Sequence, residues 1–317
     1  MLRSGASLMV LGWHNVEGTW CFPAALGAGR RGLEQQLTAL RRLTTIVPLR
    51  WALHALDEGR PLPPRALSIT FDDGYRDTLT LAGPLLRELG VPATCYLVPG
   101  ILSDEVVPWW EELAWAFTRT TADRLERHGQ ILALGSERDR RAAFRTVSEQ
   151  LKQRDRRERD AAIEEIVTAL APTGTRHSRV QFLDWDGARQ LQEYMDIGSH
   201  SGYHAILSRE TAAAQQRDLA DSRRQLADRL AAPIDVLAYP NGTTDDFGTE
   251  TLAAAEQAGY THAVTTERGL NTHATPRYGI RRWVMKPERG AVELGKILRD
   301  LALPARHSGR VTDPEGG

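Results

Sequence analysis

Residues 66–75 read Ala-Leu-Ser-Ile-Thr-Phe-Asp-Asp-Gly-Tyr, and this stretch decides the fold. Its first six residues follow Pro64 and stop at two carboxylates and a glycine, which is typical of a buried strand that ends in a sharp turn. Because successive side chains of an extended chain alternate in direction, Asp72 and Asp73 point different ways. One can ligate a metal while the other serves as a base. The simpler interpretation is an Asx-type turn or a helix cap, and taken alone the pattern more often means capping.

Similar apolar runs recur along the chain and alternate with helical patterns. This alternation predicts parallel strands joined by helices, an α/β fold. Leucines at helical spacing indicate one of the helices, and a glycine at position 90 ends another. The expected strands are 7–13, 66–71, 93–98, 194–198, 236–239, 262–265 and 280–284, and the expected helices among the early strands are 31–43 and 78–89.

A region of different character separates the early strands from the late ones, at about 101–180. It begins with an apolar segment that contains Trp109 and Trp110 and continues as charged helices across 119–170. The mixed-sign run 152–160 predicts a solvated helix face with i,i+4 ion pairs, and phosphate or polyanion binding is the second interpretation. We therefore expect a single domain over 1–302 with a helical insertion at about 101–180, followed by a disordered tail at 303–317.

Composition excludes several classes of protein. The 317 residues contain 40 Lys+Arg and 41 Asp+Glu, so the net charge of −1 gives no sign of nucleic-acid or anionic-membrane binding. The two cysteines, Cys21 and Cys95, lie in apolar or aromatic surroundings outside any CxxC pair. We expect two buried free thiols and no cysteine-ligated zinc.

The N-terminal apolar run is short and lacks a small-residue cleavage site, so it predicts a buried strand rather than a secretory signal. No stretch approaches the roughly 18 apolar residues that a membrane-spanning helix needs. The sequence therefore predicts no transmembrane segment and a cytoplasmic location.

A second polar motif, Ser199-His200-Ser201-Gly202-Tyr203-His204, also follows an apolar strand. Histidines at i and i+4 can bind one metal ion from a single turn or tight loop, although the pair alone is only suggestive. Together with Asp73 they offer one oxygen and two nitrogens, a facial set that leaves room for water. In a parallel barrel the strand C-termini face one mouth, so these ligands can meet there.

Two further features lie at strand ends. Tyr239-Pro240-Asn241-Gly242 predicts a turn, and a backbone N–H in it can face a developing oxyanion. His14 ends the first strand. A lone histidine beside apolar residues is more often a packed core residue, but its place at a strand end favours a catalytic role.

Taken together, these residues resemble the polysaccharide deacetylase family, also called the NodB-homology or carbohydrate esterase family 4 group. Residues 70–75 match its first motif and residues 200–204 its second. The resemblance extends from about 7 to 285 and implies a distorted (β/α) barrel of the NodB-homology type. It further implies that Asp73, His200 and His204 bind a divalent metal, most often Zn²⁺, and that Asp72 is the general base.

The sequence departs from the common family pattern in two places. Typical family members carry the general-acid histidine in a C-terminal Leu-x-His motif. This sequence matches that motif only superficially, at His307. The segment around His14 instead resembles the permuted exopolysaccharide and poly-N-acetylglucosamine deacetylases, in which this histidine is the general acid, so we expect His14 to take that role. The family arginine that orients the catalytic aspartate falls at Ala238, and Arg281 or Arg282 is a candidate replacement, unless both are surface charges.

The resemblance implies a hydrolase that removes N-acetyl groups from an amino-sugar glycan or a lipid-linked saccharide, in exopolysaccharide or cell-surface polysaccharide synthesis. Asn241, Pro240 and Tyr75 are the expected oxyanion or substrate contacts. Trp109 and Trp110 either line a sugar-binding rim or anchor the insertion. Two alternatives stay open, namely a same-fold amidase acting on a small non-sugar amide and a non-catalytic glycan-binding barrel.

Overall fold

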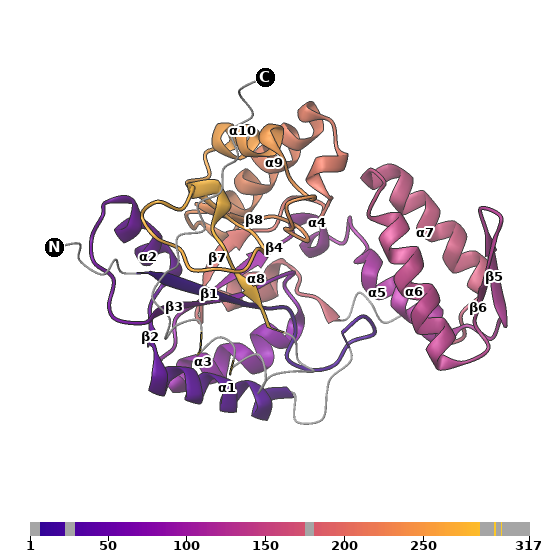
Figure 1. The fold of residues 1–317 in the computed structure, drawn as a ribbon, viewed down its shortest axis with the longest axis horizontal. Coiled ribbons are helices and arrows are strands. Elements are labelled where there is room, and N and C mark those ends of the chain that lie inside the picture. The colour runs from indigo at the N-terminus through magenta and orange to yellow at the C-terminus, as the bar shows by residue number, and fades with distance from the viewer. Residues whose placement is uncertain (1–6, 23–28, 175–180, 286–294, 296–298, 300–317) are drawn as a thin grey trace, which may run out of the picture.

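A curled parallel sheet forms the centre of the protein in a computed structural model, which describes residues 7–22, 29–174, 181–285, 295 and 299 (Figure 1). Its strand order in the described residues is β10-β1-β3-β4-β7-β8-β9, and β2 pairs with β3 as well. All of these pairings are parallel. The carboxyl ends of the strands therefore lie at one mouth. The strands are β1 (Leu8–Trp13), β2 (Thr45–Ile46), β3 (Ala66–Phe71), β4 (Ala93–Leu97), β7 (Asp196–Ser199), β8 (Val236–Ala238), β9 (His262–Val264) and β10 (Trp283–Val284).

The central strands are buried along their whole length, as parallel strands covered by helices are expected to be. β1, β3 and β4 contain no exposed residue. Helices cover the outside of the sheet, with α1 and α3 together on one side and α9 and α10 packed against each other on another (Figure 1). The helices that cover the sheet are α1 (Gly29–Leu43), α2 (Leu49–Asp57), α3 (Gly83–Leu89), α4 (Pro99–Leu102), α8 (Trp185–Leu191), α9 (Ala212–Leu230) and α10 (Thr249–Ala258).

The segment around β10 joins the two edges of the sheet. Ile280 lies beside β9, because its N–H donates to the carbonyl of Ala263 at 3.0 Å and its own carbonyl accepts from Thr265 at 2.8 Å. Three residues later Trp283 pairs with Leu11 of β1. A strand was expected over 280–284. Only the last part is regular, because the chain passes from one edge of the sheet to the other.

The insertion forms a lobe beside the barrel, at the right of Figure 1. Both α6 and α7 pack on α5, and they bury a separate set of apolar side chains that includes Val147 and Ile163. The lobe contains α5 (Trp109–Arg119), β5 (Arg124–Arg127), β6 (Gln130–Ala133), α6 (Glu137–Leu151) and α7 (Arg156–Leu170).

The expectation of helices alone across 119–170 was wrong at one place, because β5 and β6 form an antiparallel hairpin. The hairpin is mostly exposed, with Leu125 as its one buried residue, and the apolar residues of β6 follow one another directly, so it has no apolar alternation to mark it. The helix expected at 78–89 begins with a π-helical turn, Thr78–Ala82, and continues as α3. None of the helices in the described part of the chain is both long and apolar enough to cross a bilayer. The tail expected at 303–317 lies outside the described residues.

Candidate metal centre and active site

Four strand ends bring the predicted site residues to one mouth of the barrel. His14 follows β1, the Asp72–Asp73 pair follows β3, His200 follows β7, and Asn241 lies in the loop after β8. The pairing of β1 with β3 and of β4 with β7 sets the register of these ends. The site is therefore assembled by strand order and not by closeness in sequence.

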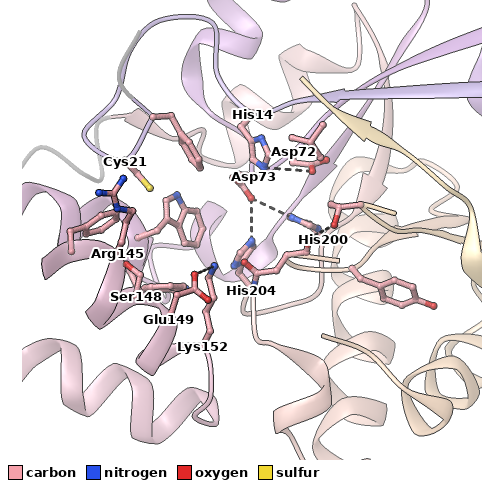
Figure 2. A pocket seen from close by; sticks show the side chains of 18 of the residues that line it. His14, Cys21, Asp72, Asp73, Arg145, Ser148, Glu149, Lys152, His200 and His204 are labelled. Carbon is pink, nitrogen blue, oxygen red and sulfur yellow. Dashed lines mark hydrogen bonds and ion pairs between the residues drawn. The ribbon is translucent and has the colours of Figure 1, made fainter. Parts of the chain in front are cut away.

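Asp73, His200 and His204 converge on a common point (Figure 2). Asp73 Oδ1 lies 3.4 Å from His200 Nε2 and 3.3 Å from His204 Nε2, and the candidate ligand atoms all lie within 4.8 Å of one another. All three residues are buried, and Asp73 Oδ1 has no hydrogen-bond partner among the described residues. One carboxylate oxygen and two imidazole nitrogens around an otherwise unsatisfied buried atom fit a divalent cation.

The surroundings of His200 keep it suitable as a metal ligand. Its Nδ1 lies 2.7 Å from the carbonyl oxygen of Ala238, and donation of a proton there leaves Nε2 free to face Asp73. Burial lowers the pKa of His200 to about 4, and His204 contributes in the same direction. His200 is therefore neutral at physiological pH, the state in which imidazole binds metal.

The loops that carry the candidate site residues contain several non-glycine residues in the left-handed region. The φ angles are 69° at Asp73, 61° at Ser201, 49° at His204 and 57° at Asn241. Such conformations cost free energy at non-glycine residues and persist where the surroundings enforce them, as at binding sites. Gly74, which was expected to permit a sharp exit from the strand, has φ of 75°.

Arg282 is the direct partner of Asp72. Its two terminal nitrogens donate to the two carboxylate oxygens at 2.6 and 2.8 Å, and the guanidinium is fully buried. Burial acts to raise the pKa of Asp72, but Arg282, followed by His200 and His14, outweighs it and holds the pKa below the ordinary value. Asp72 is thus ionised and fixed in orientation. Arg281, the other candidate, is exposed, and its side chain lies against Gly269.

His14 lies on the other side of Asp72. Its Nε2 is 3.9 Å from Asp72 Oδ2, and its ring stacks on Phe22 with a centroid separation of 5.2 Å. The His14 side chain is 25% exposed, whereas that of Asp72 is 3% exposed. The histidine can therefore meet a group that arrives from solvent.

A cavity of about 400 Å³ opens above these residues. The barrel supplies one side of it, and α6 of the insertion supplies the other (Figure 2). Sequence reasoning missed the contribution of α6, because nothing in a charged amphipathic helix marks the face that will meet a distant strand end. The lining residues that were not predicted are Cys21, Phe22, Phe144, Arg145, Ser148, Glu149, Lys152, Tyr239, Thr266 and Val284.

The family model for polysaccharide deacetylases matches residues 59–263. The chain belongs to the polysaccharide deacetylase family.

Individual relatives agree with this assignment. The chain is 29% identical over 110 residues to YxkH of Bacillus subtilis, covering 35% of this chain and 38% of YxkH. It is 23% identical over 271 residues to the poly-beta-1,6-N-acetyl-D-glucosamine N-deacetylase of Escherichia coli K12, covering 83% of this chain and 34% of that protein. The chain thus spans little more than a third of the length of these curated relatives.

A solved structure shows the same fold. The Streptococcus pyogenes deacetylase PplD superposes with a TM-score of 0.61 at 15% identity, over 94% of this chain and 99% of that one. At this identity the likeness concerns the fold alone, and it supports the distorted (β/α) barrel that the sequence predicted.

Two of the expected substrate contacts in this family member do not line the cavity. Tyr75 is 1% exposed, and its hydroxyl donates to Glu111 Oε1 at 2.8 Å and accepts from Trp110 Nε1 at 2.8 Å. Pro240, in the loop after β8, is buried and does not line the cavity, whereas Asn241 does. Tyr75 therefore supports the wall behind the site instead of bordering it.

The two tryptophans and the cysteines also differ from expectation in part. Trp109 and Trp110 are buried in the core of the insertion, as the anchoring interpretation expects, and both also line the cavity, while a sugar-binding role stays a prediction. The Trp110 ring lies 4.3 Å from that of His204. Both cysteines are free, but Cys21 is only half-buried and lines the cavity, whereas Cys95 is buried as expected.

The charged run at 152–160 is not simply a solvated face. Arg159 is 1% exposed, and its Nη1 donates to the carbonyl oxygen of His204 at 3.2 Å. Arg156 lies over the ring of Tyr203 at 4.4 Å, and Lys152 lines the cavity. The run therefore braces the loop that carries both histidines. His307, the alternative acid, lies outside the described residues.

Proposed function

We propose that this chain is a divalent-metal-dependent hydrolase that removes N-acetyl groups from an amino-sugar glycan. The observation that carries the proposal is the pairing of two adjacent carboxylates with different partners. Asp73 faces His200 and His204, whereas Asp72 faces Arg282 and His14. These contacts support a metal-ligand role for Asp73 and a proton-acceptor role for Asp72, side by side below a cavity of about 400 Å³.

Zn²⁺ is the ion we propose for the site. Zinc takes imidazole nitrogen and carboxylate oxygen, and catalytic zinc sites use three protein ligands with one position left open. When bound, such an ion supplies Lewis acidity that polarises the acetamide carbonyl and lowers the pKa of water.

The remaining roles belong to the protein's own side chains. Asp72 accepts the proton of the attacking water, and Arg282 keeps its carboxylate ionised and oriented. The backbone N–H of Asn241 donates to the oxyanion that develops on the former carbonyl oxygen. His14, partly exposed beside Asp72, donates a proton to the leaving amine. The products are acetate and a free amino sugar.

The relatives support the substrate class that we propose. One of them is named a poly-beta-1,6-N-acetyl-D-glucosamine N-deacetylase, so we propose an N-acetylglucosamine-containing glycan or a lipid-linked precursor in exopolysaccharide or cell-surface polysaccharide synthesis. The open cavity walled by Trp109, Trp110 and Phe144 supports a saccharide, because aromatic faces stack on pyranose rings.

The test is acetate release by zinc-loaded protein from N-acetylglucosamine oligomers of increasing length. A panel of small non-sugar acetamides is assayed beside them. Release from the oligomers, lost on chelation and restored by zinc, is the expected result. Release from the small amides alone would favour the amidase alternative. Saccharide binding without hydrolysis of any amide would favour the glycan-binding barrel.

A further inference from the structure

The wall formed by α6 differs chemically from the rest of the cavity. The charged side chains that the barrel contributes to the cavity have partners within the barrel. Asp72 pairs with Arg282, and Asp73 faces two histidines. At the C-terminal end of α6, Lys152 Nζ lies 2.8 Å from Glu149 Oε1. Arg145 also lines the cavity, and among the described residues it has no hydrogen bond or ion pair.

Arg145 also borders a second cavity of about 450 Å³, which shares Cys21, Phe144 and Arg145 with the first. This second cavity is basic, because three arginines and one glutamate line it. Two of the arginines are engaged, since Arg140 donates to the carbonyl oxygen of Leu134 at 3.1 Å and Arg141 pairs with Glu137. The arginines of this cavity without a carboxylate partner among the described residues are therefore Arg140 and the exposed Arg145, and Arg145 is the one that lies where the two cavities meet.

A second observation points to a ligand at the same wall. Ser148 is 8% exposed, its Oγ has no hydrogen-bond partner among the described residues, and it lines the cavity one helical turn from Arg145. Trp109 of α5 also lines the cavity, and its Nε1 is likewise buried without a hydrogen-bond partner among the described residues. Both groups can donate a hydrogen bond. An unsatisfied buried donor is costly, so donors left free on a cavity wall indicate that the occupant brings acceptor oxygens.

We propose that α6 forms a binding subsite for an anionic group, a carboxylate or phosphate, attached to the amino sugar or to the neighbouring sugar. Arg145 binds the anionic oxygens, and Ser148 and Trp109 donate to hydroxyl or ring oxygens of the same saccharide. Guanidinium matches the planar or tetrahedral oxyanion geometry of these groups and forms stronger hydrogen bonds to charged than to neutral acceptors. This inference rests on the proposed function and specifies the substrate class of the same site.

The test uses the full chain carrying Asp72→Asn, loaded with zinc, so that binding is measured without turnover. Three probes are titrated calorimetrically: the N-acetylglucosamine disaccharide, a disaccharide of N-acetylglucosamine and a uronic acid, and N-acetylglucosamine 1-phosphate. The subsite predicts that at least one acidic probe binds about tenfold or more tightly than the neutral one. The preference for uronate or for phosphate identifies the source of the anion. Added salt should reduce the preference.

Arg145→Gln should abolish the preference and leave binding of the neutral disaccharide unchanged. Arg138→Gln is the matched control, because Arg138 is an exposed arginine of the same helix that lines neither cavity. Equal binding of all three probes, no binding of any probe, or equal effects of the two substitutions would overturn the subsite.

Ser148→Ala provides a second measurement. It removes a hydroxyl without a partner, so the free protein should unfold at the same or a higher denaturant concentration, while saccharide binding weakens severalfold. Unchanged binding would exclude Ser148 from the subsite. The proposed function is tested separately, by acetate release from neutral oligomers. That reaction does not depend on whether Arg145 makes the protein prefer acidic saccharides.

Discussion

At the scale of single residues, the site depends on a buried ion pair between positions far apart in the sequence. Arg282 is fully buried, and its bidentate contact with Asp72 lies beside the candidate metal ligand Asp73. Burial lowers the pKa of Arg282, but the Asp72 carboxylate outweighs this and raises it. Gly12 helps to make room, because a Cβ there would lie 3.2 Å from Arg282 Cδ.

Arg282→Met should therefore destabilise the protein strongly. It leaves the Asp72 carboxylate buried without its cation, which typically costs about 3–5 kcal/mol. The measurement is urea unfolding of both proteins. Arg281→Met is the matched control, since Arg281 is exposed and has no contact with Asp72, and it should change stability by less than about 0.5 kcal/mol. Equal effects of the two substitutions would refute the role of Arg282.

At the scale of elements, the insertion is joined to the barrel through the loop that carries both histidines. Arg159 of α7 donates to the carbonyl oxygen of His204 at 3.2 Å. From the barrel, the N–H of Gly100 at α4 donates to the carbonyl oxygen of Gly202 in the same loop at 2.9 Å. The insertion therefore helps to fix the position of a proposed metal ligand.

Arg159→Met keeps an apolar stem but removes the donor to the His204 carbonyl. We expect zinc affinity to fall by about 10-fold or more, because partners that orient a ligand have effects of that size. A competition titration against a chromophoric chelator measures it. Arg157→Met, at an exposed position of the same helix, should leave the affinity unchanged. Indistinguishable affinities would show that α7 does not orient His204.

The sequence alone predicted those elements whose pattern is strong. Buried strands such as β1 and β3 were placed within one residue, because a continuous apolar run bounded by turn residues has few alternative structures. The hairpin β5–β6 and the short helix α2 were not predicted. The left-handed backbone at Asp73 and His204 could not be predicted either, since the surroundings and not the residue type impose it.

The candidate site, too, was predictable where its residues belong to local sequence motifs. Motifs local in sequence, the pair at 72–73 and the residues at 200–204, were found. Arg282 was only one of two candidates, because a contact across 210 residues leaves no local signal. The cavity wall on α6 was missed for the same reason, and Tyr75 was assigned to the cavity because its position in the motif does not reveal which way its side chain packs.

At the scale of the whole molecule, stability should depend on pH through a buried carboxyl beneath the histidine loop. Asp218 of α9 accepts a hydrogen bond from the N–H of Gly202, and burial raises the pKa of Asp218 to about 7 from an ordinary 3.8. At pH values between these two pKa values, Asp218 keeps its proton in the folded protein and has lost it in the unfolded chain. This contribution to stability is therefore complete below about pH 4 and is lost as the pH rises to about 7.

Asp218→Asn should remove this part of the pH dependence while it preserves an acceptor for Gly202. The free energy of unfolding of the wild type, relative to the variant, should decrease by at most about 1.4 kcal/mol per pH unit between pH 4 and pH 7 and then level off. Urea unfolding at a series of pH values measures the difference. Parallel stability curves for the two proteins would show that Asp218 does not titrate in this window.

The central claim is that the two adjacent carboxylates have separate tasks, Asp73 as metal ligand and Asp72 as base. The most direct measurement is zinc content and acetate release from N-acetylglucosamine oligomers for the wild type, Asp72→Asn and Asp73→Asn. We expect Asp72→Asn to retain its zinc and to lose activity by about 10²–10⁴-fold. Asp73→Asn should lose both zinc and activity. Near wild-type turnover by Asp72→Asn, or full zinc content in Asp73→Asn, would contradict the account.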